Sequence, residues 1–456
     1  MRPLPLSTTS FVGRERDEAA VAHLLHRGDV RLLTLTGPSG VGKTRLAVQV
    51  AAGLTDAYPD GVAFVDLACV TTIEGVSTAL ATAVGVPSGP GHAQRPGTAD
   101  AVADALAACL ASKHMLLVLD TVEHVVSALA LLPRLLASCP DVVILATGRC
   151  PLGVQGECVF PVPMLAYPDP ICPPPAEDIA HYAAVTLYVQ RVRAMLPDFV
   201  VTEPLLVSIA ALCARLDGLP LAIELAASRV VLLPPAVLLG RRTHMFALLT
   251  GGPRDAPARH QGLRASLDWS YELLDARPRA LVRRLSVFEG DCTLDAVEVV
   301  CRSIDGTAGD LLDDLTALMD MSLLQVTRVD AETAAGPRVA LLNTTRQYGS
   351  EYLERSGEAE TMYKRHAAYY LALAERASVG ELPVLLTDER DNLHAAWCWA
   401  QEHGGLQVGE RLVRALQGHG SEYRPALQVH PRLPEAALET TSPGPQPVRE
   451  RSKLHR

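Results

Sequence analysis

Three glycines, a lysine and a threonine stand within one short stretch near the N-terminus, GPSGVGKT. They are Gly37, Gly40, Gly42, Lys43 and Thr44. Glycines let the backbone N–H groups of a loop converge on phosphate oxygens, and the N-terminus of a following helix adds its positive dipole end. The lysine would reach the β- and γ-phosphates of a nucleoside triphosphate, and the threonine hydroxyl would bind Mg²⁺.

The residues on either side of this stretch decide between a phosphate site and a glycine-rich surface turn. A β-like run precedes it at 31–36, and a helix-like run follows at 43–54. A strand, a glycine-rich loop and a helix in this order are the context that a phosphate-binding loop requires. The sequence therefore predicts binding of a nucleoside triphosphate with Mg²⁺, and the surface turn is the less favoured interpretation.

Two polar residues follow apolar runs typical of strands. Asp120 comes directly after the run at 115–119, where a carboxylate can hold Mg²⁺ or its water shell; an aspartate that caps the next helix is the alternative. The spacing from the phosphate loop favours the metal role. Arg149 follows the run at 142–146, where a cation can sense a γ-phosphate, although a lone arginine is more often solvated.

Periodicity and linkers divide the chain. Short apolar runs alternate with helical patterns up to a proline cluster at 161–175, which predicts a parallel sheet with helices on both faces. Helical patterns dominate next, and after a second linker at 251–261 three helices and a hairpin suggest a winged helix. The predicted phosphate-binding, helical, winged-helix-like, further helical and poorly ordered segments are 1–165, 176–250, 262–350, 360–417 and 426–456.

Local signals refine this outline. Thr71 and Glu74 predict a capping box for a helix that runs to about residue 84, and Thr98 predicts the cap of another. The ten cysteines show no CxxC pair and no Cys/His metal spacing, so we expect buried free thiols.

Composition narrows the class of protein. An apolar content of 48% predicts a globular chain, and a net charge of -10 gives the whole chain no electrostatic attraction to nucleic acid or anionic lipid. The N-terminus lacks an apolar signal core, and no apolar run approaches the roughly 18 residues of a membrane span. We therefore expect a cytoplasmic protein without a membrane partner.

Eight motifs follow one another in a fixed order between about residues 8 and 400. They are FVGRERDE, GPSGVGKT, LLVLDTVEH, LATGRCPLGVQGE, RLDGLPLAIELAA, LRASLDWSYELL, LSVFEGDCTLDAVEVVC and LLNTTRQY. As a set they resemble the NB-ARC-type ATPases of the STAND class, particularly the bacterial branch found in large LuxR-type and antibiotic-pathway transcriptional regulators. The resemblance implies an α/β P-loop NTPase fold, then helical and winged-helix domains, and the start of an α-helical, TPR-like repeat region.

The same resemblance assigns roles by position. Val12 and Arg14 would line the adenine and ribose side of the nucleotide, and Pro220 would contact the base from the helical domain. The lysine and threonine of the loop would hold the phosphates. Asp120 would hold Mg²⁺, and Arg149 would be the sensor. A nucleotide held between three domains would act as a molecular switch.

Departures from the family pattern bear on hydrolysis and on completeness. Many relatives carry an acid directly after the strand-end aspartate, whereas this chain has Thr121, and its next carboxylate is Glu123. Asp120 and Glu123 are the candidate catalytic pair, and we expect at most a slow ATPase. The sequence shows no flanking DNA-binding domain and no long repeat array, so we expect a truncated or degenerate member.

Functions from different classes follow. The favoured one is a nucleotide-dependent switch in transcription or signalling that acts through self-association or protein partners. Its rival is an enzyme that hydrolyses ATP with real turnover. Direct DNA binding through the segment RPRALVRRL at 277–285 is weaker, because its arginines alternate with core positions and a solvated helix face is favoured. We do not expect this chain alone to bind DNA.

Overall fold

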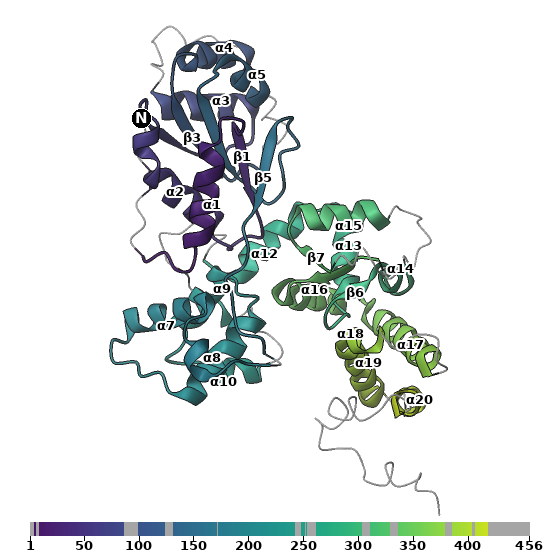
Figure 1. The fold of residues 1–456 in the computed structure, drawn as a ribbon. Helices are drawn as coiled ribbons and strands as arrows, with labels where there is room; N and C mark the ends of the chain where they lie inside the picture. The colour runs from purple at the N-terminus through teal and green to yellow at the C-terminus, as the bar shows by residue number, and fades with distance from the viewer. Residues whose placement is uncertain are drawn as a thin grey trace, which may run out of the picture. The chain divides into compact units, whose positions relative to one another are not determined.

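A computed structural model places most of the chain (Figure 1). The residues that it describes are 4–5, 9–85, 99–123, 131–170, 172–241, 248–250, 252, 261–302, 311–328, 336–378, 385–403 and 406–417. The chain forms two compact units. The first contains Met1–Val287 and Asp291–Ala359, and the second contains Phe288–Gly290 and the chain from Glu360 onward.

A five-stranded parallel sheet lies at the centre of the N-terminal part of the first unit. Its order is β2-β3-β4-β1-β5. The strands are β1 (Leu32–Thr36), β2 (Val62–Asp66), β3 (Met115–Asp120), β4 (Val142–Thr147) and β5 (Glu157–Pro161). The predicted parallel sheet is confirmed. Strand β5 was not predicted; it can end in Pro161 because it is an edge strand, where a missing N–H is tolerated.

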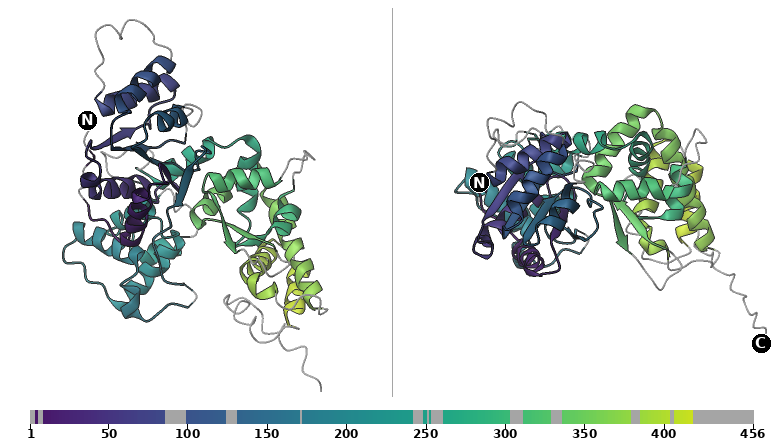
Figure 2. Two further views of the ribbon diagram at one scale, coloured as in Figure 1. Left: turned by 45° about the horizontal axis from the view of Figure 1, so that its top comes forward. Right: turned by 90° about the horizontal axis from the view of Figure 1, so that it is seen from above.

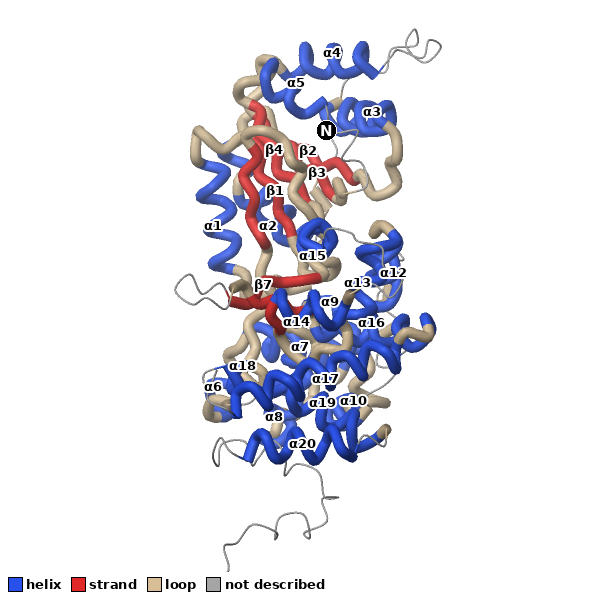
Figure 3. The backbone as a smooth tube through the Cα atoms, turned by 90° about the vertical axis from the view of Figure 1, so that its right-hand side faces the viewer, coloured by secondary structure: helices blue, strands red, loops and turns tan. Residues whose placement is uncertain are grey.

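Helices cover both faces of this sheet (Figures 2 and 3). Alternate side chains of a strand point to opposite faces, so Leu33 and Leu35 join one core and Leu32 joins the other. The first core includes α1 (Glu15–His26) and α2 (Lys43–Gly53). The second includes α3 (Ile73–Val84), α4 (Ala99–Leu110) and α5 (Leu131–Ser138). A 3-10 helix, η1 (Thr55–Ala57), follows α2.

The predicted cap of α3 is wrong by one residue. Thr72, not Thr71, adopts the extended conformation before the helix, and its Oγ1 accepts a hydrogen bond from the Gly75 N–H at 3.1 Å. A side chain caps a helix from the last non-helical position, which Thr72 occupies. The predicted cap of α4, Thr98, lies outside the described residues.

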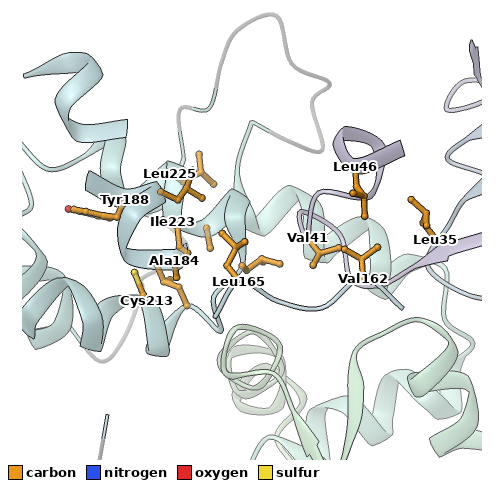
Figure 4. Close-up of a cluster of buried hydrophobic side chains, with 14 of the residues drawn as sticks. Leu35, Val41, Leu46, Val162, Leu165, Ala184, Tyr188, Cys213, Ile223 and Leu225 are labelled. Atoms are coloured by element: carbon orange, nitrogen blue, oxygen red, sulfur yellow. The ribbon is translucent and has the colours of Figure 1, made fainter. Parts of the chain in front are cut away.

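A helical region follows the sheet. Its helices are α6 (Ala176–Ile179), α7 (Ala183–Met195), α8 (Glu203–Arg215), α9 (Pro220–Ser228) and α10 (Pro235–Gly240). Its apolar side chains continue the core beneath the phosphate loop (Figure 4). Leu46 of α2, Val162 and Leu165 after β5, and Ile223 of α9 belong to one buried cluster. The helical region and the sheet therefore share a core.

The predicted winged helix is present in the last part of the first unit. Its elements are α12 (Leu263–Glu272), α13 (Ala276–Leu285), β6 (Cys292–Thr293), α14 (Leu294–Cys301), α15 (Leu311–Asp320), β7 (Leu324–Arg328), β8 (Arg338–Leu341) and α16 (Asn343–Ser356). The predicted hairpin corresponds to β7 and β8, and the short strand β6, which was not predicted, completes an antiparallel sheet of order β6-β8-β7.

The second unit is helical. It is built around α17 (Ala359–Ser378), α18 (Leu385–Asp388), α19 (Arg390–Glu402) and α20 (Leu406–Gln417). His366 is buried against Phe288 and Tyr370, and burial lowers the pKa of His366 to about 4. The repeat-type identity of these helices stays a prediction, and the tail predicted at 426–456 lies outside the described residues.

The structure bears on two predictions made from composition, one about membrane-spanning segments and one about the cysteines. Within the described part of the chain, every helix is too short or too polar to cross a bilayer. All ten cysteines are free thiols, but the expectation that they are buried is wrong for Cys69, Cys109 and Cys172. Those three are exposed because they lie after β2, on the outer side of α4 and in the proline-rich segment.

Candidate nucleotide-binding site

The glycine-rich loop joins β1 to α2, in the predicted context. Gly40 and Gly42 have φ angles of 84° and 101°, in the left-handed region that favours glycine. Gly42 is the N-cap of α2, so the loop ends at a helix N-terminus. A Cβ atom at Gly40 would lie 2.7 Å from the Leu221 Cβ atom. Gly40 is therefore needed both for its backbone angle and for close packing against α9.

Lys43 places a positive charge inside the loop. Its Nζ atom donates hydrogen bonds to the carbonyl oxygens of Gly37 at 2.7 Å and Pro38 at 3.0 Å. An ammonium group held in a glycine-rich loop at the N-terminus of a helix suits a phosphate ligand. The loop and its lysine therefore fit the predicted phosphate site.

The two predicted Mg²⁺ ligands lie in direct contact. The Thr44 hydroxyl donates to Asp120 Oδ1 at 2.6 Å, and the Thr147 hydroxyl donates to the same oxygen at 2.5 Å. Asp120 is 5% exposed, and burial raises its pKa. Thr147, which ends β4, was not predicted as a site residue; its only signal was a hydroxyl at the end of a buried strand.

The chemistry of these donors fits magnesium. Hydroxyl and carboxylate oxygens are hard ligands, and Mg²⁺ is usually held by one or two of them together with nucleotide phosphates and water. Across the described residues, no group of three or more His, Cys, Asp or Glu side chains could form an all-protein metal site. Thr44 and Asp120 are therefore the residues that would hold Mg²⁺ beside a bound nucleotide.

Replacing Asp120 with asparagine is expected to separate metal binding from stability. Asparagine keeps an oxygen that can accept from Thr44 and Thr147 but loses the negative charge that attracts Mg²⁺. Because burial raises the pKa of Asp120, the ionised form is disfavoured in the folded chain, and the neutral amide removes that cost. Calorimetry with Mg²⁺ and with EDTA should show that nucleotide affinity no longer depends on Mg²⁺.

A melting curve of the nucleotide-free Asp120→Asn variant provides the control. Its melting temperature should equal or exceed that of the wild type. A lower melting temperature with unchanged Mg²⁺ dependence would assign Asp120 to the fold rather than to the metal.

Arg149 is buried, so the alternative that it is a solvated surface arginine is wrong. Its side chain is 1% exposed, and its Nε atom lies 3.3 Å from Glu123 Oε1. The guanidinium carbon lies 4.3 Å from the centroid of the Trp269 ring in α12. The Ser322 hydroxyl donates to the Arg149 carbonyl oxygen at 2.9 Å. The predicted sensor is therefore held by the predicted catalytic Glu123 and by two residues of the winged helix.

The residues predicted on the base and ribose side reach the loop in different ways. Arg14 donates to the Val41 carbonyl oxygen at 3.0 Å and pairs with Asp17 at 2.7 Å, so its guanidinium supports the loop. Val12 is half-buried and packs on the core beneath the loop. Pro220 opens α9, whose next N–H, from Leu221, donates to the Gly40 carbonyl oxygen at 3.2 Å.

Two contacts near the site, each between distant segments of the chain, were not predicted. The Ser266 hydroxyl of α12 donates to the Ser39 hydroxyl of the phosphate loop at 2.6 Å. Asp217, which precedes α9, accepts from the backbone N–H groups of Asn343 at 2.9 Å and Thr344 at 2.8 Å, at the start of α16. Asp217 and the start of α16 each lie in a motif noted in the sequence, but nothing in the sequence indicates that these two motifs are in contact.

The arginines of α13 differ from the solvated face that was favoured. Arg284 is 8% exposed and pairs with Glu358 at 2.6 Å. Arg279 donates to the Tyr271 carbonyl oxygen at 2.9 Å, and Arg283 donates to the Tyr271 hydroxyl at 2.9 Å. The expectation is therefore wrong for Arg284, which is buried, whereas Arg277 has a side chain that is 52% exposed, as expected for a solvated face.

Comparison with known proteins agrees with this architecture. Residues 26–151 match the AAA domain family, and residues 274–354 match the winged helix-turn-helix domain family. With the phosphate loop and the parallel sheet, these matches define an AAA-type P-loop ATPase domain followed by a helical region and a winged-helix domain.

The chain belongs to the same family as the uncharacterized protein Rv0894 of Mycobacterium tuberculosis. The two are 36% identical over 360 residues, which cover 78% of this chain and 85% of Rv0894. The putative HTH-type transcriptional regulator Rv0890c of the same organism is 38% identical over 394 residues, which cover 85% of this chain. This chain spans 42% of the length of Rv0890c.

Two further proteins are more distantly similar to this chain. The regulatory protein AfsR of Streptomyces coelicolor is 27% identical over 419 residues, which cover 84% of this chain and 37% of AfsR. The STAND protein PH0952 of Pyrococcus horikoshii, which has a tetratricopeptide repeat sensor, is 15% identical with a TM-score of 0.30, covering 89% of this chain and 50% of PH0952.

Proposed function

We propose that this chain is a nucleotide-dependent molecular switch of the NB-ARC type that acts in transcriptional regulation. The observation that carries the proposal is contact of the winged helix with both the phosphate loop and Arg149. Ser266 binds Ser39 of the loop, and Trp269 covers Arg149. A change in what the loop and Arg149 bind would therefore alter how α12 is held.

The residues of the site divide the work of holding a nucleotide. Lys43 and the loop N–H groups bind phosphates, Thr44 and Asp120 hold Mg²⁺, and the metal neutralises phosphate charge when bound. Arg14 supports the loop from the N-terminal side, and Pro220 brings α9 against it. We propose that 1–165, 176–250 and 262–350 are the three parts that a nucleotide couples.

The output of such a switch is a change of conformation. A ligand shifts a two-state equilibrium only by its difference in affinity for the two states. ATP and ADP differ by the γ-phosphate, and Arg149, the residue that we propose distinguishes them, contacts Trp269 of the winged helix. One relative is named a putative HTH-type transcriptional regulator and another a regulatory protein, and these names support a regulatory output. We propose that this output passes through self-association or protein partners.

One experiment tests the proposal directly. The full chain is purified, its bound nucleotide is extracted and identified chromatographically, and hydrogen exchange is then compared with ADP and with a non-hydrolysable ATP analogue. We expect a resident nucleotide and a different exchange rate in α12 for the two ligands. A chain that binds neither nucleotide, or one whose winged helix exchanges identically with both, contradicts the switch.

Real ATPase turnover is the rival, and the surroundings of Glu123 argue against it. Its carboxylate is paired with Arg149 and is 5% exposed, so it is poorly placed to take a proton from water. Thr121, which follows Asp120, has no ionisable group. Steady-state phosphate release should therefore be well below the enzyme median of about 10 per second.

The Glu123→Gln variant is the control for this measurement. It should change the slow rate little, since the amide replaces a carboxylate that is already paired. A rate near the median that disappears in Glu123→Gln and in Asp120→Asn would favour the enzyme.

The winged helix-turn-helix match favours DNA as a second candidate ligand. Against it, the arginines at 279, 283 and 284 bind groups of their own domain, and the chain carries a net charge of -10. We propose that this chain reaches DNA through partners.

A further inference from the structure

Arg149 follows the strand that lies next to β1 in the sheet. Strand β4 pairs in parallel with β1, and the Gly148 N–H donates to the Leu35 carbonyl oxygen at 3.0 Å. The carboxyl ends of parallel strands meet at one edge of a sheet, so Arg149 follows β4 at the edge where the phosphate loop follows β1. A cation at this place can recognise a γ-phosphate through charge-assisted hydrogen bonds.

Arg149 is nevertheless covered. Its side chain is 1% exposed, with the Trp269 ring centroid at 4.3 Å on one side and Glu123 Oε1 at 3.3 Å. A phosphate cannot reach guanidinium N–H groups that have no accessible surface. Any contact with a γ-phosphate therefore requires that one of these neighbours move.

Trp269 is the neighbour that belongs to a different part of the fold. Glu123 follows β3 of the same sheet, whereas Trp269 lies on α12 of the winged helix. Three residues before it, Ser266 binds Ser39 of the phosphate loop at 2.6 Å. Ser322, from the turn before β7, holds the Arg149 carbonyl oxygen. The winged helix thus holds both the side chain and the backbone of Arg149.

We propose that Trp269 is the positioning residue of Arg149, and that the Trp269 ring and the γ-phosphate of a nucleoside triphosphate compete for this guanidinium. The inference rests on the proposed function and deepens it, because it names the contact through which a triphosphate releases α12. A diphosphate lacks the competing group and leaves the Arg149–Trp269 contact in place.

The test measures the affinities of the full chain for ADP and for a non-hydrolysable ATP analogue by calorimetry. Trp269→Ala removes the competing ring, so the analogue should bind about 5- to 30-fold more tightly, the range expected for a partly to fully desolvated cation–π contact. ADP affinity should not change. Trp269→Phe keeps an aromatic face and should return the ratio of the two affinities toward the wild-type value.

Two variants separate this effect from a general loosening of α12. Tyr271→Ala removes another aromatic ring of the same helix, one that faces Arg279 at 5.8 Å and not Arg149, and it should leave the ratio unchanged. In an Arg149→Ala background, Trp269→Ala should have no further effect on the analogue. Equal changes in both affinities, or additive effects of Arg149→Ala and Trp269→Ala, overturn the proposal.

A second measurement keeps the Trp269 ring in place. The chain has three tryptophans, so a Trp397→Phe, Trp399→Phe variant reports Trp269 fluorescence alone. The ATP analogue should shift this emission, ADP should not, and Arg149→Ala should abolish the difference. Binding of both nucleotides with no difference in emission refutes the competition and leaves the switch standing. Absence of any nucleotide binding refutes both.

Discussion

Replacing Lys43 with alanine is expected to weaken the binding of ATP and ADP strongly. The Lys43 ammonium lies inside the loop, bonded to the carbonyl oxygens of Gly37 and Pro38, where it would meet the phosphates. A charge-assisted hydrogen bond contributes about 1.5 to 3 kcal/mol, so the loss of one weakens the complex roughly 10- to 150-fold. Isothermal calorimetry on the full chain measures the change.

The matched control is Lys113→Ala. That lysine pairs at the surface with Asp60 at 2.8 Å, far from the loop in sequence, and its removal should leave nucleotide affinity unchanged. The melting curve of nucleotide-free Lys43→Ala should stay cooperative. Wild-type affinity in a folded Lys43→Ala variant would refute the assignment of the phosphate site.

Replacing Asp217 with alanine is expected to destabilise the first unit and to loosen the start of α16. Asp217 accepts from two backbone N–H groups and from the Thr344 hydroxyl, so a carboxylate before α9 caps a helix of the winged helix. Thr344 is 1% exposed, and its two donors would lose their partner. Each such loss costs about 1 to 3 kcal/mol, and we expect a total of about 2 to 4 kcal/mol.

Denaturant unfolding and hydrogen exchange check this prediction. Amides in the first turn of α16 should exchange faster in Asp217→Ala. Asp217→Asn is the conservative control, since asparagine tolerates the left-handed φ of 56° at this position and keeps one acceptor oxygen. Its stability should fall between those of Asp217→Ala and the wild type. If the amides of this turn exchange at the wild-type rate in Asp217→Ala, the contact with Asp217 does not hold the start of α16.

Sequence predicted the elements of the fold better than their contacts. Strands β3 and β4 are apolar up to their last residue, which is the pattern of strands buried on both faces, and β1 and β2 are mainly apolar runs, so local sequence was sufficient. Strand β5 was not predicted because it is half exposed and ends in a proline. The hairpin β7–β8 was found since both strands flank a polar turn.

In the candidate site, too, single residues could be predicted from the sequence but contacts between distant segments could not. The phosphate loop and Asp120 were predictable because a single segment carries each signal. The pairing of Arg149 with Trp269 and that of Asp217 with α16 join residues more than a hundred positions apart, and periodicity carries no information about such contacts. The solvated face expected for α13 is wrong at Arg284 for the same reason, since its partner Glu358 lies far along the chain.

The apolar cluster of Figure 4 has a consequence for how the chain gains and loses its structure. Val41 and Leu46 beside the loop share a buried core with Ala184 and Ile223 of the helical region. Parts that share a core unfold as one cooperative unit. Proteolytic cleavage in the proline-rich segment would therefore leave both halves with bare apolar surface, prone to aggregate, and neither would survive as an independent folding unit.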